Sequence, residues 1–137
     1  PNFRLPMVGT DTEQVVTLAD LKGQVAVINF WAPWCPTCKE DLPLLESVWN
    51  SYGDQGVAFL GPAFDTTNEA IEESVTLYGM TYPVGIDAGD HMANAYGITG
   101  VPETFVLDSE GHIAHIHVGS LSEQQLTSEL DILLGRQ

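Results

Sequence analysis

Positively charged residues are scarce in this sequence: four Lys and Arg stand against nineteen Asp and Glu, for a formal charge of −15. A surface of that sign repels the phosphate backbone of DNA and RNA, so the composition excludes an ordinary nucleic-acid-binding protein. The acidic residues are spread along the chain rather than gathered in a tail, which is typical of a well-solvated surface. Attraction of basic partners, or adaptation to salt, is the alternative interpretation.

The sequence also lacks an apolar run long enough to cross a bilayer. The longest run, residues 25–36, is interrupted by Asn29 and is much shorter than the about 20 residues that a membrane-spanning helix needs. No charged and apolar leader precedes it, and the chain begins at Pro1 rather than at Met. We therefore expect residues 1–137 to form one soluble domain, in a processed or trimmed form.

Cysteine is nearly absent, and the only two, Cys35 and Cys38, lie three positions apart. A disulfide between them would close so short a loop that chain entropy predicts about 2 kcal/mol of stabilisation at most. A structural disulfide would join distant segments instead. The spacing therefore predicts a pair that exchanges electrons rather than one that holds the fold together.

Strand-like and helix-like segments alternate along the chain, which predicts an α/β fold. Residues 25–30 form a continuous apolar run, typical of a strand buried on both faces. We expect Asn68 to cap a helix that Gly79 ends. Further strands are expected at 3–7, 15–18, 57–60, 82–86, 104–107 and 113–118, and helices at 35–52, 68–78, 91–96 and 122–134.

The position of Cys35, where a strand gives way to a helix, predicts a reactive sulfur. Unpaired N–H groups and the helix dipole at that point favour negative charge on the sulfur. Cys38, one turn into the helix, is placed to attack a mixed disulfide formed at Cys35. Pro36 suits the first helical turn because its missing N–H is not needed there, and Thr37 adds no charge. Because no His or Lys stands between the cysteines, we expect a reductant rather than a strong oxidant.

A Cys-x-x-Cys pair can also be half of a zinc site, which needs two further ligands. His115 and His117, on one face of a strand, could supply them. The strand-to-helix context favours redox chemistry instead, and we expect His112, His115 and His117 to lie on the hairpin surface. No metal ion and no cofactor are expected.

Pro102 stands just before an expected strand, where it cannot donate a hydrogen bond to a sheet ladder. It therefore marks a sheet edge or a special turn. The bond before a proline adopts the cis form at modest cost, although residue types alone favour trans.

The motifs around Cys35 and Pro102 resemble those of the thioredoxin superfamily. Within it, the chain is similar over nearly its whole length to the TlpA/ResA/CcmG (DsbE)-like branch, the reductases of cytochrome c maturation. The segments that carry the resemblance are residues 3–6, 18–23, 30–39 with Pro43, and 96–105. It implies a thioredoxin fold, with a central mixed β-sheet flanked by helices, an N-terminal β-hairpin, and a helix and strand inserted over residues 65–82.

The resemblance also implies a role for each residue at the motif. Cys35 would be the nucleophile and Cys38 the resolving thiol. Pro102 would be a cis-proline, and the backbone of Val101 before it would pair with a bound substrate strand. The other residues expected to contact substrate are Trp34, Pro36, Thr37 and Glu103.

An acid–base partner for the cysteines is expected at an unusual position. Cytosolic thioredoxins carry a buried Asp six residues before the first cysteine, where this chain has Asn29, which cannot exchange a proton. Relatives in this branch often carry an acid six residues after the first cysteine, and Asp41 stands there, on the helix face of Cys38. Glu103 is a second candidate. The alternative for either acid is a solvated surface charge.

The sequence thus predicts an enzyme that reduces protein disulfides outside the cytoplasm, in the periplasm or at the outer face of the cytoplasmic membrane, with room for a membrane anchor in the full-length form. The expected partners are a protein disulfide, such as apocytochrome c or a maturation carrier, and a membrane or periplasmic dithiol donor. A monomer is expected. The alternatives are a general disulfide oxidant or isomerase, and a module that binds copper or haem through its cysteines.

Overall fold

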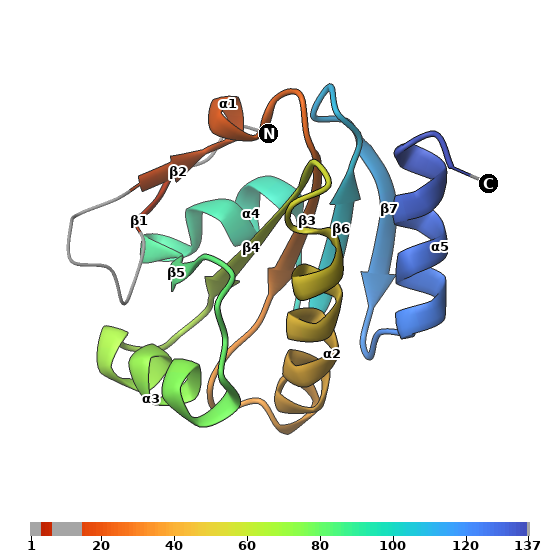
Figure 1. The fold of residues 1–137 in the computed structure, drawn as a ribbon. Coiled ribbons are helices and arrows are strands. Elements are labelled where there is room, and N and C mark those ends of the chain that lie inside the picture. The colour runs from red at the N-terminus through yellow and green to blue at the C-terminus, as the bar shows by residue number, and fades with distance from the viewer. Residues whose placement is uncertain (1–3, 7–14, 137) are drawn as a thin grey trace.

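The computed structural model describes residues 4–6 and 15–136. A five-stranded sheet, in the order β5-β4-β3-β6-β7, forms its centre, and a separate antiparallel pair, β1–β2, lies beside it (Figure 1). Phe3 and Met7, the two ends of the strand expected at 3–7, lie outside the described residues. The strands are β1 (Arg4–Pro6), β2 (Val15–Thr17), β3 (Val25–Phe30), β4 (Val57–Ala63), β5 (Val84–Ile86), β6 (Glu103–Leu107) and β7 (Ile113–Val118).

Strand β3 is the middle of a mixed sheet. It runs parallel to β4 and antiparallel to β6, and all six of its residues are buried. Because side chains alternate along a strand, Val25 and Val27 enter the core on one face, and Ala26, Ile28 and Phe30 enter the core on the other. The expectation of an α/β fold with a central two-faced strand is confirmed.

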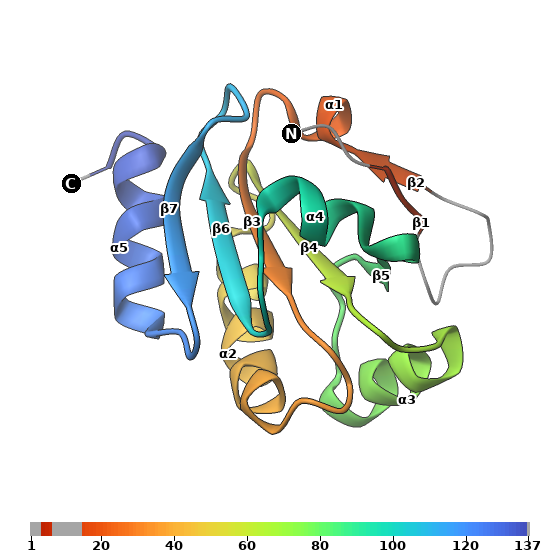
Figure 2. The same cartoon turned by 180° about the vertical axis from the view of Figure 1, so that it is seen from behind.

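Helices cover both faces of this sheet. Helices α2 and α5 lie on one face, and Figure 2 shows α4 across the other. The helices are α1 (Leu18–Leu21), α2 (Pro36–Tyr52), α3 (Asn68–Tyr78), α4 (His91–Tyr96) and α5 (Glu123–Leu133), with a 3-10 turn at Ala88–Asp90. None of the helices in the described ranges combines the length and apolar composition needed to span a membrane.

Two expectations about helix starts were wrong. Thr67, not Asn68, caps α3: its backbone is extended and its hydroxyl accepts a hydrogen bond from the Ala70 N–H at 3.2 Å. Helix α1 begins where the second strand was expected to continue. Thr17 and Asp20 form a capping box there, which turns the chain into a helix after a strand of three residues. Gly79 ends α3 in the left-handed conformation, as predicted.

The sheet topology brings the two predicted motifs together. Because β3 and β6 are antiparallel, Phe30 at the end of β3 pairs with Glu103 at the start of β6. The chain therefore enters the Cys35 turn and leaves the Pro102 turn at the same edge of the sheet. Strand β4 is parallel to β3 and ends at this edge too, with Ala63 bridged to Trp31. The helix that follows it, α3, consequently starts beside the cysteine motif.

Candidate active site

Cys35 and Cys38 are joined in a disulfide at the start of α2, with Cα atoms 5.3 Å apart. Cys35 is the N-cap residue, with extended backbone, and the Cys38 N–H donates a hydrogen bond to the Cys35 sulfur at 3.1 Å. Pro36 occupies the first turn of the helix. In the reduced protein, that N–H and the dipole of the 17-residue helix would stabilise a thiolate on Cys35.

The sulfurs are surrounded unequally. Cys35 is 5% exposed and Cys38 only 1%. The residues between them, Pro36 and Thr37, are exposed, and Trp34 is 53% exposed. The Trp34 indole N–H donates to the Asp65 carbonyl at 2.8 Å, which attaches the cysteine turn to the segment before α3. A partner molecule therefore meets Cys35 first.

The Pro102 turn lies against the same sulfur. The Val101–Pro102 peptide bond is cis, and the Val101 carbonyl oxygen lies 3.9 Å from the Cys35 sulfur. The Pro102 carbonyl accepts a hydrogen bond from the Gly119 N–H at 2.9 Å, which anchors the turn to the β7–α5 connection. A hollow of about 230 Å³ opens beside Val101 and Gly100. The structure thus places the Val101 carbonyl, which the sequence assigned to the same site, beside the Cys35 sulfur.

Asp41 is buried rather than solvated, at 4% exposure. Its Oδ1 accepts a hydrogen bond from the Leu121 N–H at 3.4 Å, and its Oδ2 has no hydrogen-bond partner in the described residues. Burial raises the pKa of this carboxyl above its usual range; the Leu121 bond opposes that rise, and the charge of Glu40 adds to it. Asp41 is therefore a buried, incompletely hydrogen-bonded acid one helical turn beyond Cys38, and the surface-charge alternative does not hold for it.

Tyr82, which the sequence did not single out, lies near this acid. It is 3% exposed, and its hydroxyl has no hydrogen-bond partner among the described residues. Burial raises its pKa far above the usual value, and the negative charges of Glu46 and Asp41 raise it further. Nothing in the sequence around Tyr82 indicates that this residue is buried near Asp41.

Glu103 and Asn29 are held by the β3–β6 pair. Glu103 is half-buried, and burial raises the pKa of its carboxyl. The buried Asn29 amide donates to the Thr104 hydroxyl at 2.8 Å. Asn29 is thus a structural hydrogen-bonding group at the position where cytosolic thioredoxins have an acid.

The histidines of the β6–β7 hairpin do not share one environment. His112 is exposed, as expected, but the expectation is wrong for His117, whose side chain is only 13% exposed. Its Nε2 lies 2.7 Å from an oxygen of Glu129 on α5, and His115 approaches the same carboxylate at 3.5 Å. The cause is helix α5, which covers this face of β7.

Comparison with known proteins gives one family and a consistent set of relatives. The Redoxin family matches residues 1–133. The thiol-disulfide oxidoreductase ResA of Bacillus thuringiensis (strain Al Hakam) is 33% identical over 131 residues, which are 95% of this chain and 73% of that protein. ResA of Oceanobacillus iheyensis is 29% identical over an alignment of 138 positions that covers 100% of this chain and 72% of that protein.

Two solved structures share this fold over nearly their whole length. A putative thiol:disulfide interchange protein DsbE from Chlorobium tepidum has a TM-score of 0.89 at 26% identity, covering 98% of this chain and 94% of that one. A putative thioredoxin from Neisseria meningitidis has a TM-score of 0.87 at 30% identity, covering 97% and 87%. The similarity therefore spans both the Cys35 turn and the Pro102 turn.

Proposed function

Because the chain belongs to the Redoxin family, in the TlpA/ResA/CcmG-like branch of the thioredoxin superfamily, and is a thiol–disulfide oxidoreductase, we propose that it reduces disulfides of protein substrates through Cys35 and Cys38. The observation that carries the proposal is the Cys35–Cys38 disulfide at the start of α2, with a backbone N–H directed at the Cys35 sulfur. In its reduced, dithiol form this pair supplies the two electrons that reduce a substrate disulfide, and the helix start supplies the field that activates one of the two sulfurs.

The reaction begins from the dithiol form. The Cys35 thiolate attacks one sulfur of the substrate disulfide, a mixed disulfide forms, and the other substrate sulfur leaves as a thiolate that takes up a proton. Cys38 then loses its proton and attacks the Cys35 sulfur. The second substrate thiolate leaves, and the protein is left with the Cys35–Cys38 disulfide. An external dithiol must return two electrons before the next cycle.

We propose that the Asp41 carboxylate accepts the proton that the Cys38 thiol loses when it attacks the mixed disulfide. The two residues are three positions apart on α2, so their side chains share a helix face. A carboxylate whose pKa is raised by burial takes up a proton more readily near neutral pH than an ordinary Asp does. Its Oδ2, without a hydrogen-bond partner in the described part of the chain, is the atom that would accept the proton.

The substrate polypeptide would lie across the Pro102 turn. We propose that the Val101 backbone pairs with an extended substrate segment, because its carbonyl is next to the Cys35 sulfur. Trp34, Pro36 and Thr37 form the exposed rim on the other side. Glu103, half-buried at the start of β6, completes the expected contact set.

The direction of electron flow follows from the charges around the cysteines. Glu40, Asp41 and Glu103 are acidic, and no His lies between Cys35 and Cys38. Negative charge disfavours thiolates nearby, so the disulfide is the comparatively stable form and the dithiol is a good electron donor. Equilibration with a glutathione redox buffer tests this, and a midpoint as oxidising as that of the strongest periplasmic oxidants would contradict the proposal.

We place this reductase outside the cytoplasm, in cytochrome c maturation, with the oxidised haem-binding cysteine pair of apocytochrome c or a carrier protein as its substrate and an extracytoplasmic dithiol as its donor. The Cys-Pro-Thr-Cys motif and the Pro-Glu-Thr-Phe sequence at 102–105 support that assignment through their resemblance to this branch. The ResA-named relatives are consistent with it.

A trapping experiment tests the division of roles. The Cys38→Ala variant keeps the nucleophile and loses the resolving thiol, so it should accumulate a mixed disulfide with an oxidised peptide that carries an apocytochrome c haem-binding cysteine pair. The matched Cys35→Ala variant should trap little, because its remaining thiol is the more buried one. Mass spectrometry of the adducts reads the outcome. If Cys35→Ala were the better trap, the assigned roles would be reversed.

A further inference from the structure

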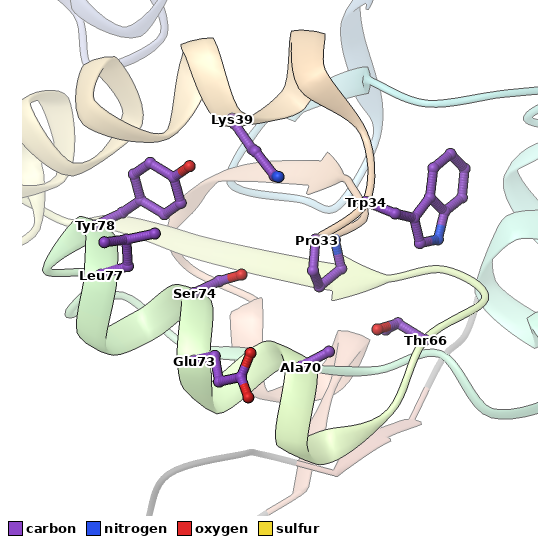
Figure 3. Close-up of a pocket in the computed structure, with 9 residues that line it drawn as sticks. All are labelled: Pro33, Trp34, Lys39, Thr66, Ala70, Glu73, Ser74, Leu77 and Tyr78. Atoms are coloured by element: carbon purple, nitrogen blue, oxygen red, sulfur yellow. The ribbon is translucent and has the colours of Figure 1, made fainter.

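A groove of about 340 Å³ opens beside the cysteine turn and takes no part in the proposed exchange of disulfides (Figure 3). Pro33, Trp34 and Lys39 line it from the cysteine turn and α2. The opposite wall is α3 and the segment before it, with Thr66, Ser74 and Leu77. Trp34 borders the groove and directly precedes Cys35, so the groove lies next to the cysteine turn.

Two hydrogen-bond donors face this groove, and neither has a partner in the described part of the chain. Lys39 is one of only four Lys and Arg residues in the sequence, which has nineteen Asp and Glu. It nevertheless forms no ion pair among the described residues. Ser74 is 6% exposed, and its hydroxyl makes no hydrogen bond within residues 4–6 and 15–136. Figure 3 shows the ammonium group and the hydroxyl directed into the groove from its two walls.

An ammonium group and a hydroxyl on opposite walls suit an acceptor with two oxygens and a negative charge. A carboxylate has that form, and a charge-assisted hydrogen bond from Lys is stronger than a neutral one. Pro33, Ala70 and Leu77 supply apolar surface for the methylene groups that carry a side-chain carboxylate. A basic side chain would instead meet the Lys39 charge.

We propose that this groove binds the carboxylate of an Asp or Glu side chain in the substrate polypeptide, close to the cysteine that bonds to Cys35. The inference rests on the proposed function, because it places the acid relative to the mixed disulfide. Lys39 lies one helical turn beyond Cys35, with its N–H donating to the Cys35 carbonyl at 3.2 Å. An extended chain covers such a distance in about two residues.

Glu73 opposes this preference and so provides a second way to test it. It is exposed and lines the same groove, without an ion pair to Lys39 in the described structure. Its charge repels a substrate carboxylate. Removing the Glu73 charge should therefore strengthen the preference for an acidic substrate side chain, whereas removing the Lys39 charge should abolish it.

The experiment uses short peptides, each with one cysteine joined to thionitrobenzoate as a mixed disulfide and with Glu, Gln or Lys two residues from that cysteine. Release of thionitrobenzoate by the reduced protein gives a rate constant for each peptide. We expect the Glu peptide to react about two- to fivefold faster than the Gln peptide, with the difference shrinking as salt is added. Lys39→Met should bring the ratio to one or below, because the Glu73 charge then repels the carboxylate unopposed. Ser74→Ala should lower the ratio, and Glu73→Gln should raise it.

The matched control is Lys22→Met, which removes an exposed Lys at the end of α1 and should keep the wild-type ratio. Equal rate constants for the Glu, Gln and Lys peptides would overturn the carboxylate site while leaving the disulfide exchange intact. A preference for the Lys peptide, or a Glu preference that survives Lys39→Met, would overturn it as well. No release from any peptide, by protein with both thiols titratable, would refute the proposed function instead.

Discussion

Replacing Asp41 by Asn should make the oxidised protein more stable and a poorer reductase. The carboxyl is 4% exposed and has one long hydrogen bond, from the Leu121 N–H at 3.4 Å, with Oδ2 unpartnered in the described residues. An Asn side chain keeps an oxygen for Leu121 and loses the charge. A buried polar group without a partner costs about 1–3 kcal/mol, and a charged one costs more. We expect Asp41→Asn to raise the free energy of unfolding by about 1–2 kcal/mol at about pH 8.

The pH dependence of that gain follows from the raised pKa of Asp41. Because burial raises it above the ordinary value of 3.8, the folded state holds the proton more tightly than the unfolded state does. Wild-type stability is therefore reduced as the pH rises from the ordinary value through the folded pKa, and the cost is constant above that. The gain from Asp41→Asn should be full at about pH 8 and should shrink toward about pH 4.

Urea unfolding of the oxidised wild type and variant, across this pH range, measures the difference. Glu40→Gln is the matched control: its carboxylate is exposed, and its removal should change stability by less than about 0.5 kcal/mol. A stability difference that is absent at all pH values, or that stays the same on acidification, would refute the argument that a buried charge is responsible.

The same variant should exchange disulfides more slowly. Without a carboxylate to take the proton, Cys38 would resolve the mixed disulfide more slowly, by about 10²-fold or more if Asp41 is the general base. The assay is single-turnover reduction of a peptide disulfide, with the mixed disulfide followed by mass spectrometry. If the Asp41→Asn variant resolved the mixed disulfide at the wild-type rate, Asp41 would not be the general base of the proposed mechanism.

Two further predictions concern stability, and urea unfolding checks both. Tyr82→Phe removes a buried hydroxyl that has no partner in the described structure, so it should leave the free energy of unfolding unchanged or raise it by up to about 1 kcal/mol. Tyr52→Phe loses a 2.9 Å hydrogen bond to Asp131 and should therefore lower the free energy of unfolding by about 1 kcal/mol. Equal losses would show that the Tyr82 hydroxyl is paired. Gly79→Ala should cost about 1 kcal/mol because φ is +64° there, although a Cβ would meet no atom within 4 Å. Gly100→Ala, where a Cβ also meets nothing and no positive φ is required, should stay within about 0.5 kcal/mol, and a similar loss at both sites would contradict a backbone cause.

The amino-acid sequence determined those features that depend on neighbours along the chain. Residues 25–30 are apolar throughout, and they form the central strand with both faces buried. A strand followed by Cys-Pro predicts a sulfur at a helix start, and the helix begins at Pro36. Gly79 ends its helix because few other residues adopt that conformation without strain. Such signals are local, so they survive without knowledge of the rest of the fold.

Local signals failed where two of them overlapped. Thr67 and Asn68 are both good capping residues, so the pattern alone does not distinguish them. Which of the two is extended depends on the direction of the incoming chain, and the structure has Thr67 as the cap. The short helix after Thr17 was missed because Val15 and Val16 favour a strand more visibly than Asp20 favours a cap.

Only the tertiary structure decided what surrounds each polar side chain. Asp41 is buried because the connection to α5, 80 residues away along the chain, closes over it and donates one N–H. His117 is half-buried against Glu129 for the same kind of reason, since α5 folds back onto β7. Lys39 and Ser74 face one groove because β3 and β4 are parallel and end at the same edge. The burial of a residue depends on what covers it, and the covering segments lie far from it in the sequence. Burial in turn sets the pKa of an acid and decides whether a hydrogen-bond donor finds a partner.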